Sequence, residues 1–137
     1  MPSLTGIIET SIYVDDLDRS SRFYEELFDI KHIEGNERLR AYSVGGRSVL
    51  LIFKRGASLQ ITELPFGKMG SHDGSGPLHL AFSISAEDLP EWEKLLAEKK
   101  IAIESRVRWP RGGTSLYFRD PDSNLVELAT PGVWSIY

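Results

Sequence analysis

The amino-acid sequence predicts an α+β fold made of two βαβββ modules that form a curved mixed sheet around a cleft, with the helices outside. The first observation is a repeat, because residues 9–14 (ETSIYV) read like residues 79–84 (HLAFSI) and both runs alternate. The second is that an acidic helix start containing a leucine follows each run, at residues 15–17 and 87–89. The third is that each half then closes with a strand hairpin. A repeat of this kind fixes the architecture, since one copy cannot bury its apolar face alone.

The first module is predicted to span about residues 5–54. Its opening strand covers residues 7–14, where side chains alternate in character. A helix capped by Asp16 or Asp18 then runs to about Phe28, because apolar side chains recur there at helical spacing. The strands that follow are expected at residues 31–35, 39–44 and 47–54, with Gly45 and Gly46 as the last hairpin turn.

A segment without a regular pattern, residues 55–76, separates the two modules. A loop of this length inside a compact domain is usually a lid, a binding loop or a linker. We therefore expect it to be a loop that connects the modules.

The second module, about residues 77–130, repeats the order of the first. Residues 77–85 alternate and predict its first strand, and Ser85 with Asp88 predicts the start of a helix that has one apolar face. The remaining strands are expected at residues 101–107, 115–119 and 124–129, the last two joined by the turn at residues 120–123.

Composition narrows the class of protein. The chain of 137 residues, 41% hydrophobic and 26% charged, is typical of a single globular domain, here residues 1–137. A net charge of −4 disfavours nucleic acid as a partner, because phosphate binding needs a basic surface. No window approaches the roughly 20 apolar residues of a membrane span, and the first residues do not resemble a signal peptide. Without cysteine the chain has no disulfide or thiol nucleophile, and we expect a cytoplasmic protein.

The strand alternation predicts where the chemistry lies. Side chains two positions apart share a face of a strand. If the apolar set of each strand packs under the helices, then Glu9, His79 and Glu127 all face the cleft. The same parity places these further side chains in the cleft: Ser11, Tyr13, Ser115, Tyr117 and Arg119.

Glu9, His79 and Glu127 form a candidate metal site. Three protein ligands with an open position are what a catalytic metal needs. The fourth equivalent position, Leu51, is apolar and cannot be a ligand. One imidazole with two carboxylates is a hard ligand set that favours manganese, magnesium or iron, with zinc as a further possibility. We therefore expect a divalent metal ion as the cofactor.

The second hairpin gives the chain a family resemblance. Residues 116–128 (LYFRDPDSNLVEL) resemble the final hairpin of the vicinal oxygen chelate superfamily, which includes glyoxalases, extradiol dioxygenases and bleomycin resistance proteins. The first strand followed by DLDRS at residues 16–20 is also typical, and the resemblance covers about residues 7–130. Glu127 and His79 match the family's metal ligands. Glu9 stands where the family usually has histidine.

The resemblance implies an enzyme that chelates two neighbouring oxygens of a small substrate at the metal, as a lyase, isomerase or dioxygenase. The alternative is a metal-free protein that binds a small or drug-like molecule, as bleomycin resistance proteins do. It also implies a homodimer. The expected catalytic residues are Glu127, Glu9 and Tyr117, and the expected substrate-binding residues are Ser11, Tyr13, Tyr42, Arg108 and Arg119.

Each candidate also has a purely structural interpretation. Glu9 can pair with an arginine, His79 can be a hydrogen-bonded core histidine, and Tyr117 can be a packing aromatic. Arg119, next to Asp120, can form a surface ion pair. The remaining imidazole and aromatic groups are expected to be exposed or to pack against other side chains. They are His32, His72, Trp109 and Trp134. His72 is expected to reach the cleft only if its loop closes.

Overall fold

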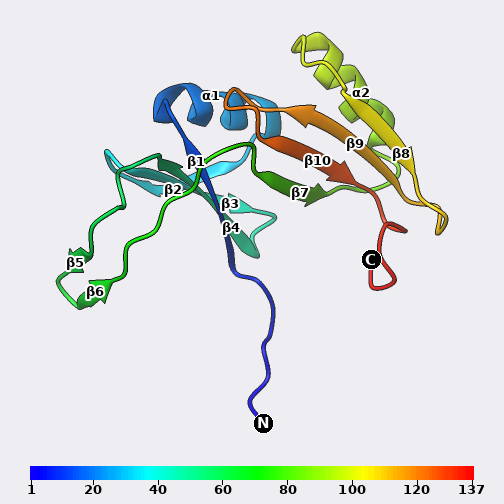
Figure 1. Ribbon diagram of the computed structural model, residues 1–137. Helices are drawn as coiled ribbons and strands as arrows, with labels where there is room; N and C mark the ends of the chain where they lie inside the picture. Colours follow the sequence, from blue (N-terminus) through cyan, green and yellow to red (C-terminus); the bar gives the residue numbers. More distant parts are fainter. The chain divides into compact units, whose positions relative to one another are not determined.

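The computed structural model describes residues 1–137 and divides the chain into two compact units, residues 1–76 and 77–137. Each unit contains one helix and its own four-stranded sheet (Figure 1). The predicted α+β class and the repeated βαβββ order are confirmed. Neither helix is long and apolar enough to cross a membrane.

Unit 1 contains the first repeat. Its elements are β1 (Glu9–Val14), α1 (Leu17–Phe28), β2 (Lys31–Gly35), β3 (Leu39–Val44) and β4 (Ser48–Lys54). The sheet has the order β1-β4-β3-β2, with β1 parallel to β4 and the other pairs antiparallel.

Unit 2 repeats this topology. Its elements are β7 (His79–Ser83), α2 (Leu89–Glu98), β8 (Ser105–Arg108), β9 (Thr114–Arg119) and β10 (Leu125–Ala129). The order β7-β10-β9-β8 again has one parallel pair, β7 with β10, and two antiparallel pairs.

Alternation in the strands forms the core of each unit as predicted. Ile12 and Val14 of β1 are buried, whereas Ser11 and Tyr13 between them are only partly covered. The helices and the helix-facing side of the strands provide most of the other buried apolar side chains. They are Tyr24, Leu27, Leu50 and Ile52 in unit 1 and Leu80, Leu96, Leu116, Phe118, Val126 and Leu128 in unit 2. Ala41, Phe53 and Ala129 are buried on the other face of their sheets.

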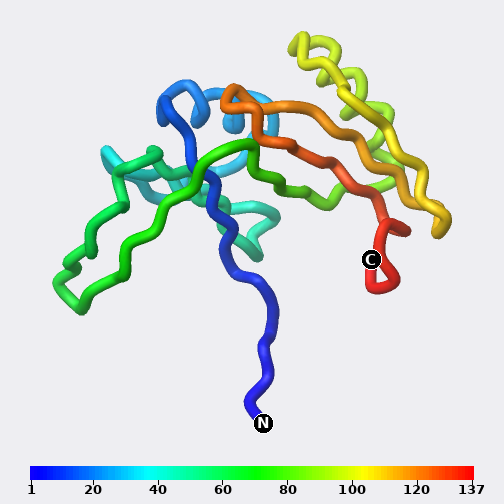
Figure 2. The backbone as a smooth tube through the Cα atoms, in the orientation of Figure 1, coloured from blue at the N-terminus to red at the C-terminus, as the bar shows by residue number.

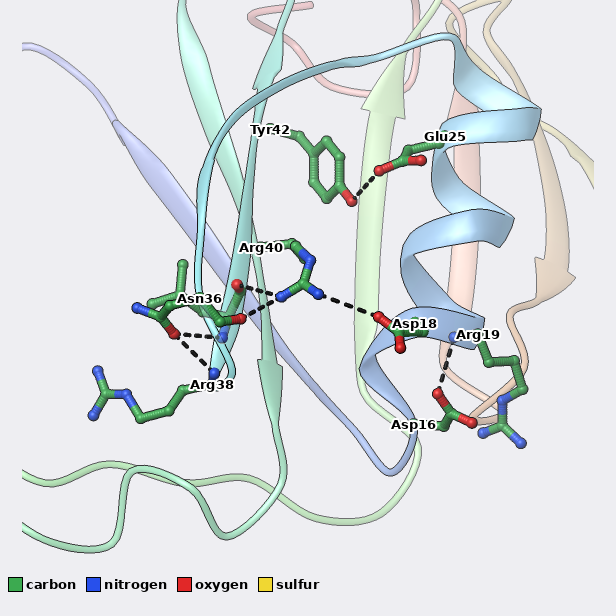
Figure 3. Close-up of polar contacts among 9 residues, drawn as sticks. Asp16, Asp18, Arg19, Glu25, Asn36, Arg38, Arg40 and Tyr42 are labelled. Carbon is green, nitrogen blue, oxygen red and sulfur yellow. Dashed lines mark hydrogen bonds and ion pairs between the residues drawn. The ribbon is translucent and has the colours of Figure 1, made fainter.

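The start of α1 is fixed by polar side chains (Figure 3). Asp16 is the N-cap, as expected, and its Oδ1 accepts the Arg19 N–H at 3.0 Å. Asp18 in the first turn pairs with Arg40 of β3 at 3.2 Å, and Arg40 also donates to the Asn36 carbonyl. These contacts join the helix start to the turn before β3.

The segment between the units differs from its prediction. Residues 55–76 contain a short hairpin, β5 (Thr62–Leu64) and β6 (Gly67–Met69), rather than an unpatterned loop. Figure 2 shows this segment leaving β4 as an arm and turning back. Strands of three residues are too short to show a period, so alternation could not predict them.

Several strand boundaries also differ. β1 begins at Glu9 rather than residue 7, β7 covers His79–Ser83 rather than residues 77–85, and β8 covers Ser105–Arg108 rather than residues 101–107. Residues 101–104 precede the strand: the Ile101 N–H closes the end of α2 by donating to the Leu96 carbonyl at 2.8 Å, and the Glu104 N–H first reaches β9 by donating to the Tyr117 carbonyl at 2.7 Å. Alternation therefore located these strands but not their ends.

Tyr42 lies in the core under α1, away from the face that holds Glu9. Its side chain is 0% exposed, and its hydroxyl donates to Glu25 Oε1 at 2.6 Å (Figure 3). Burial, together with the Glu25 carboxylate, raises the pKa of Tyr42 to about 12. Its neighbour in the ladder is the buried Leu50, so the register places Tyr42 apart from the other substrate-binding candidates.

We predict that Tyr42→Phe lowers the free energy of unfolding by about 1 kcal/mol near neutral pH, because one hydrogen bond to a carboxylate is lost. The folded-state pKa is raised, so this stabilisation is fully present below pH 10 and is lost as the pH rises from about 10 to about 12. Urea unfolding across this range should show a smaller alkaline loss in Tyr42→Phe than in the wild type. Equal losses would contradict the role of the buried phenol.

Candidate metal centre

Two of the three predicted ligands meet in unit 2. His79 on β7 and Glu127 on β10 are diagonal neighbours, since His79 lies opposite Leu125 in the parallel ladder. His79 Nε2 lies 3.2 Å from Glu127 Oε2. The Glu127 side chain is 8% exposed and that of His79 is 50% exposed, so the pair opens to one side.

The backbone of β10 sets the proton position on His79. His79 Nδ1 lies 2.8 Å from the Leu125 carbonyl oxygen, which can only accept a hydrogen bond, so Nδ1 is the donor. In the neutral imidazole, Nε2 therefore has no proton and directs a lone pair at the Glu127 carboxylate. Two lone pairs at this distance repel unless a cation, either a proton or a metal ion, lies with them. A ring nitrogen that donates to a carbonyl while the other faces the metal is the usual arrangement of a ligating histidine.

Ser115 and Trp109 hold the other oxygen of Glu127. The Ser115 hydroxyl donates to Glu127 Oε1 at 2.5 Å, and Trp109 Nε1 donates to the same hydroxyl oxygen at 2.8 Å. Ser115 is fully buried. This chain of bonds orients the carboxylate and leaves Oε2 facing the imidazole. Strand parity placed Ser115 in the cleft but gave it no role, and Trp109 was expected only to pack or to be exposed.

Tyr117 joins the pair from β9. It lies directly opposite Glu127 in the antiparallel ladder, and its ring centroid is 6.2 Å from that of His79. Burial, with a smaller contribution from the Glu127 carboxylate, raises the pKa of Tyr117. The phenol therefore keeps its proton at neutral pH and can donate a hydrogen bond beside the imidazole and the carboxylate.

Of the two arginine candidates in unit 2, Arg119 shares the face of Tyr117 but is held in an ion pair, whereas Arg108 lies on the other face. Arg119 Nε and Nη2 bind the two oxygens of Glu104 at 2.6 and 3.0 Å, which raises the pKa of Arg119 and lowers that of Glu104. This is a surface ion pair, with Glu104 rather than Asp120 as the partner. Arg108 pairs with Thr114 in the ladder and shares a face with Arg106, whose guanidinium binds Glu93 of α2 at 2.6 Å. The register thus places Arg108 on the face opposite Tyr117.

Unit 1 provides the remaining candidates on one face of its sheet. Glu9, Ser11 and Tyr13 alternate along β1 with Glu9 exposed, and the Tyr13 hydroxyl lies 2.7 Å from His72 Nδ1. Ser11 lies opposite Leu51, and Ala81 lies opposite Glu127 in unit 2, so Leu51 and Glu127 hold equivalent positions in the two repeats. Neither unit by itself gathers three His, Cys, Asp or Glu side chains that could hold a metal ion.

The comparisons with known proteins agree with this arrangement of strands. The family described as the Glyoxalase/Bleomycin resistance protein/Dioxygenase superfamily matches residues 6–128. Metallothiol transferase FosB of Bacillus licheniformis is 33% identical over 132 residues, which cover 96% of this chain and 79% of that protein. Metallothiol transferase FosB of Staphylococcus epidermidis is 32% identical over 130 residues, covering 93% and 82%.

A solved structure is also similar over almost the whole chain. Lactoylglutathione lyase from Agrobacterium tumefaciens has a TM-score of 0.88 and 29% sequence identity, covering 98% of this chain and 99% of that chain. Sequence and fold comparisons thus agree on the family.

We predict that Ser115→Ala lowers the free energy of unfolding by about 1–2 kcal/mol, because it leaves the buried oxygen of Glu127 and the Trp109 N–H without their partner. Ser83→Ala, an exposed strand position in the same unit, is the matched control and should change stability by less than about 0.5 kcal/mol. Urea unfolding at neutral pH measures both. Equal effects would show that the hydrogen-bond chain does not hold the carboxylate.

Proposed function

The chain belongs to the Glyoxalase/Bleomycin resistance protein/Dioxygenase superfamily, and from this membership we propose that it is a metal-dependent enzyme. Its substrate is a small molecule with two neighbouring oxygens that chelate the metal. The observation that carries the proposal is the 3.2 Å contact between His79 Nε2 and Glu127 Oε2, with His79 Nδ1 turned to the Leu125 carbonyl.

His79, Glu127 and Glu9 are the residues proposed to hold the metal. Nitrogen and carboxylate oxygen ligands suit a divalent ion, manganese, iron, magnesium or zinc. When bound, such an ion supplies Lewis acidity to the oxygens of the substrate. Glu9 differs from the histidine usual in the family, and this hard ligand favours manganese, magnesium or iron.

The other residues of unit 2 supply orientation and a proton. Ser115 and Trp109 fix the carboxylate, which keeps the donor atoms in place before a ligand arrives. Tyr117 keeps its proton near neutral pH and is proposed to donate a hydrogen bond from its hydroxyl to a substrate oxygen. Glu9 is proposed as a proton acceptor as well as a ligand, and Ser11 as a substrate contact.

The relatives point to reactions worth testing first. Two relatives above 30% identity are metallothiol transferases, and a structural relative is a lactoylglutathione lyase. We therefore propose transfer of a thiol to an oxygenated substrate, with lyase or isomerase chemistry on a thiol adduct as the next candidate. Thiol-transfer, lyase, isomerase and dioxygenase assays on the metal-loaded protein distinguish these reactions.

We predict that the metal-stripped protein binds Mn²⁺ with a stoichiometry of one ion per site, measured by the loss of the free Mn²⁺ signal in electron paramagnetic resonance. Glu127→Gln and His79→Ala should each weaken binding by more than about tenfold, because each removes a ligand. The matched controls, Glu87→Gln and His32→Ala, change exposed residues of the same types and should bind as the wild type does.

Wild-type affinity in Glu127→Gln and His79→Ala would contradict the metal site. A ligand-induced rise in melting temperature that persists in excess chelator would instead favour the metal-free binding protein. Glu9→Gln tests the third ligand separately, since it lies in unit 1.

We also propose a homodimer. Large apolar side chains in unit 1 are exposed, including Ile61, Leu64 and Phe66 in or beside the β5–β6 hairpin, and a two-stranded hairpin alone is marginally stable in water. Sedimentation equilibrium of the wild-type chain should give a mass of two chains. A single-chain mass over the micromolar range would contradict the dimer.

A further inference from the structure

The arm that follows β4 returns an imidazole to the Glu9 face of the unit 1 sheet. Tyr13 and Phe53 are opposite one another in the parallel ladder and stack with their ring centroids 5.8 Å apart. The His72 ring packs edge-on against Phe53 at 4.6 Å, and its Nδ1 meets the Tyr13 hydroxyl at 2.7 Å. His72 therefore lies on the same face as Glu9, at the other end of β1.

The backbone around His72 is held from several sides. The His72 N–H donates to the Ser58 carbonyl at 2.9 Å, and the Gly56 N–H donates to Asp73 Oδ1 at 3.0 Å. Arg55 Nε donates to the Gly74 carbonyl at 3.1 Å, and its guanidinium also pairs with Asp15. A Cβ at Gly74 would collide with the Tyr13 ring, so only glycine allows this approach. The imidazole is thus placed by contacts that a mobile loop would not have.

The hydrogen bond with Tyr13 bears on the proton position of His72. Burial, with a smaller effect of the Asp73 carboxylate, raises the pKa of Tyr13, so the phenol keeps its proton and can donate to Nδ1. A Tyr13 hydroxyl that donates to Nδ1 leaves the proton of the neutral imidazole on Nε2. The contacts of His72 are the Tyr13 hydroxyl, the two aromatic rings and its backbone bond, and no protein group accepts from Nε2.

An apolar strip connects this donor to Glu9. Opposite β1 the side chains on this face are Val49, Leu51 and Phe53, and one strand further they are Ser43, Ala41 and Leu39. Tyr13 lies four positions after Glu9, which corresponds to about 13 Å along a strand. A molecule bound by its oxygens near Glu9 must cross this mostly apolar surface to reach the His72 N–H.

We propose that His72 Nε2–H is a substrate-binding donor for the end of the ligand remote from the metal. The ligand class is an elongated molecule with two neighbouring oxygens at one end, an apolar middle and a carboxylate or carbonyl oxygen at the other. This inference rests on the proposed metal-dependent function. Tyr13 is a positioning residue, since it acts by fixing the tautomer and the orientation of His72.

The test compares two ligands of equal chain length. 2-Hydroxysuberate offers a chelating hydroxycarboxylate and a remote carboxylate, whereas 2-hydroxyoctanoate lacks the remote carboxylate. Isothermal titration of the Mn²⁺-loaded full chain should give about tenfold tighter binding of 2-hydroxysuberate, because the remote hydrogen bond is to a charged group. Equal affinities in the wild type would overturn the role of His72.

Two substitutions separate the role of His72 Nε2 as a donor from the role of Nδ1 as the acceptor for Tyr13. His72→Gln keeps an N–H near the place of Nε2 and should retain most of the preference for 2-hydroxysuberate. His72→Asn keeps an acceptor near the place of Nδ1 for Tyr13 but loses the remote donor, so its preference should fall to about one. A full preference in His72→Asn would overturn the proposal, because a purely structural His72 would behave in this way.

A wild-type measurement covers the case in which either variant fails to fold. The ¹⁵N and ¹H resonances of His72 Nε2 should shift on addition of 2-hydroxysuberate and not of 2-hydroxyoctanoate, and no difference would overturn the inference. If Mn²⁺ improves the binding of neither ligand, the metal site itself fails and this inference fails with it. If Mn²⁺ improves the binding of both ligands but their affinities are equal, the metal site stands and only the role of His72 is overturned.

Discussion

The two-residue period of the strands is the constraint from which both repeats follow. Because Ile12 and Val14 are buried under α1, Glu9 and Tyr13 lie on the opposite face of the unit 1 sheet. Because Leu80 is buried, His79 lies on the opposite face of the unit 2 sheet. No strand can bury its apolar set and keep these polar groups in the core. Polar side chains therefore collect on one face of each sheet before any specific contact is considered.

The pairing register of the strands determines contacts that the two-residue period of each strand does not determine. His79 donates to the carbonyl of Leu125 because β7 and β10 pair with these residues opposite one another. That single backbone contact decides which nitrogen of the imidazole is free to face Glu127. A shift of one residue would reverse the faces of β10 and separate the pair, so the electrostatics of the site depend on the ladder.

The sequence was sufficient for the repeated order, the buried faces and the meeting of His79 with Glu127, since each of these follows from alternation. It was insufficient where contacts depend on register or on non-local packing. Arg108 lies on an edge strand whose pairing turns it away from Tyr117, and Trp109 reaches Ser115 from the connection between β8 and β9. Ser115 was placed in the cleft by its parity with Tyr117, but its bond to Glu127 was not predicted, and Trp109 had no local signal. Glu9 as the third ligand and the single-domain boundaries remain predictions.

The repeats have kept one topology and diverged in the chemistry of one face. The ladders make Leu39, Ala41 and Leu51 of unit 1 equivalent to Ser115, Tyr117 and Glu127 of unit 2. One module therefore has the hydrogen-bonded carboxylate and phenol, and the other has an apolar surface at the same positions. Leu51 cannot be a ligand in the proposed metal site, and the neighbouring positions Leu39 and Ala41 are also apolar. This face of unit 1 is therefore suited to contact the carbon chain of a ligand.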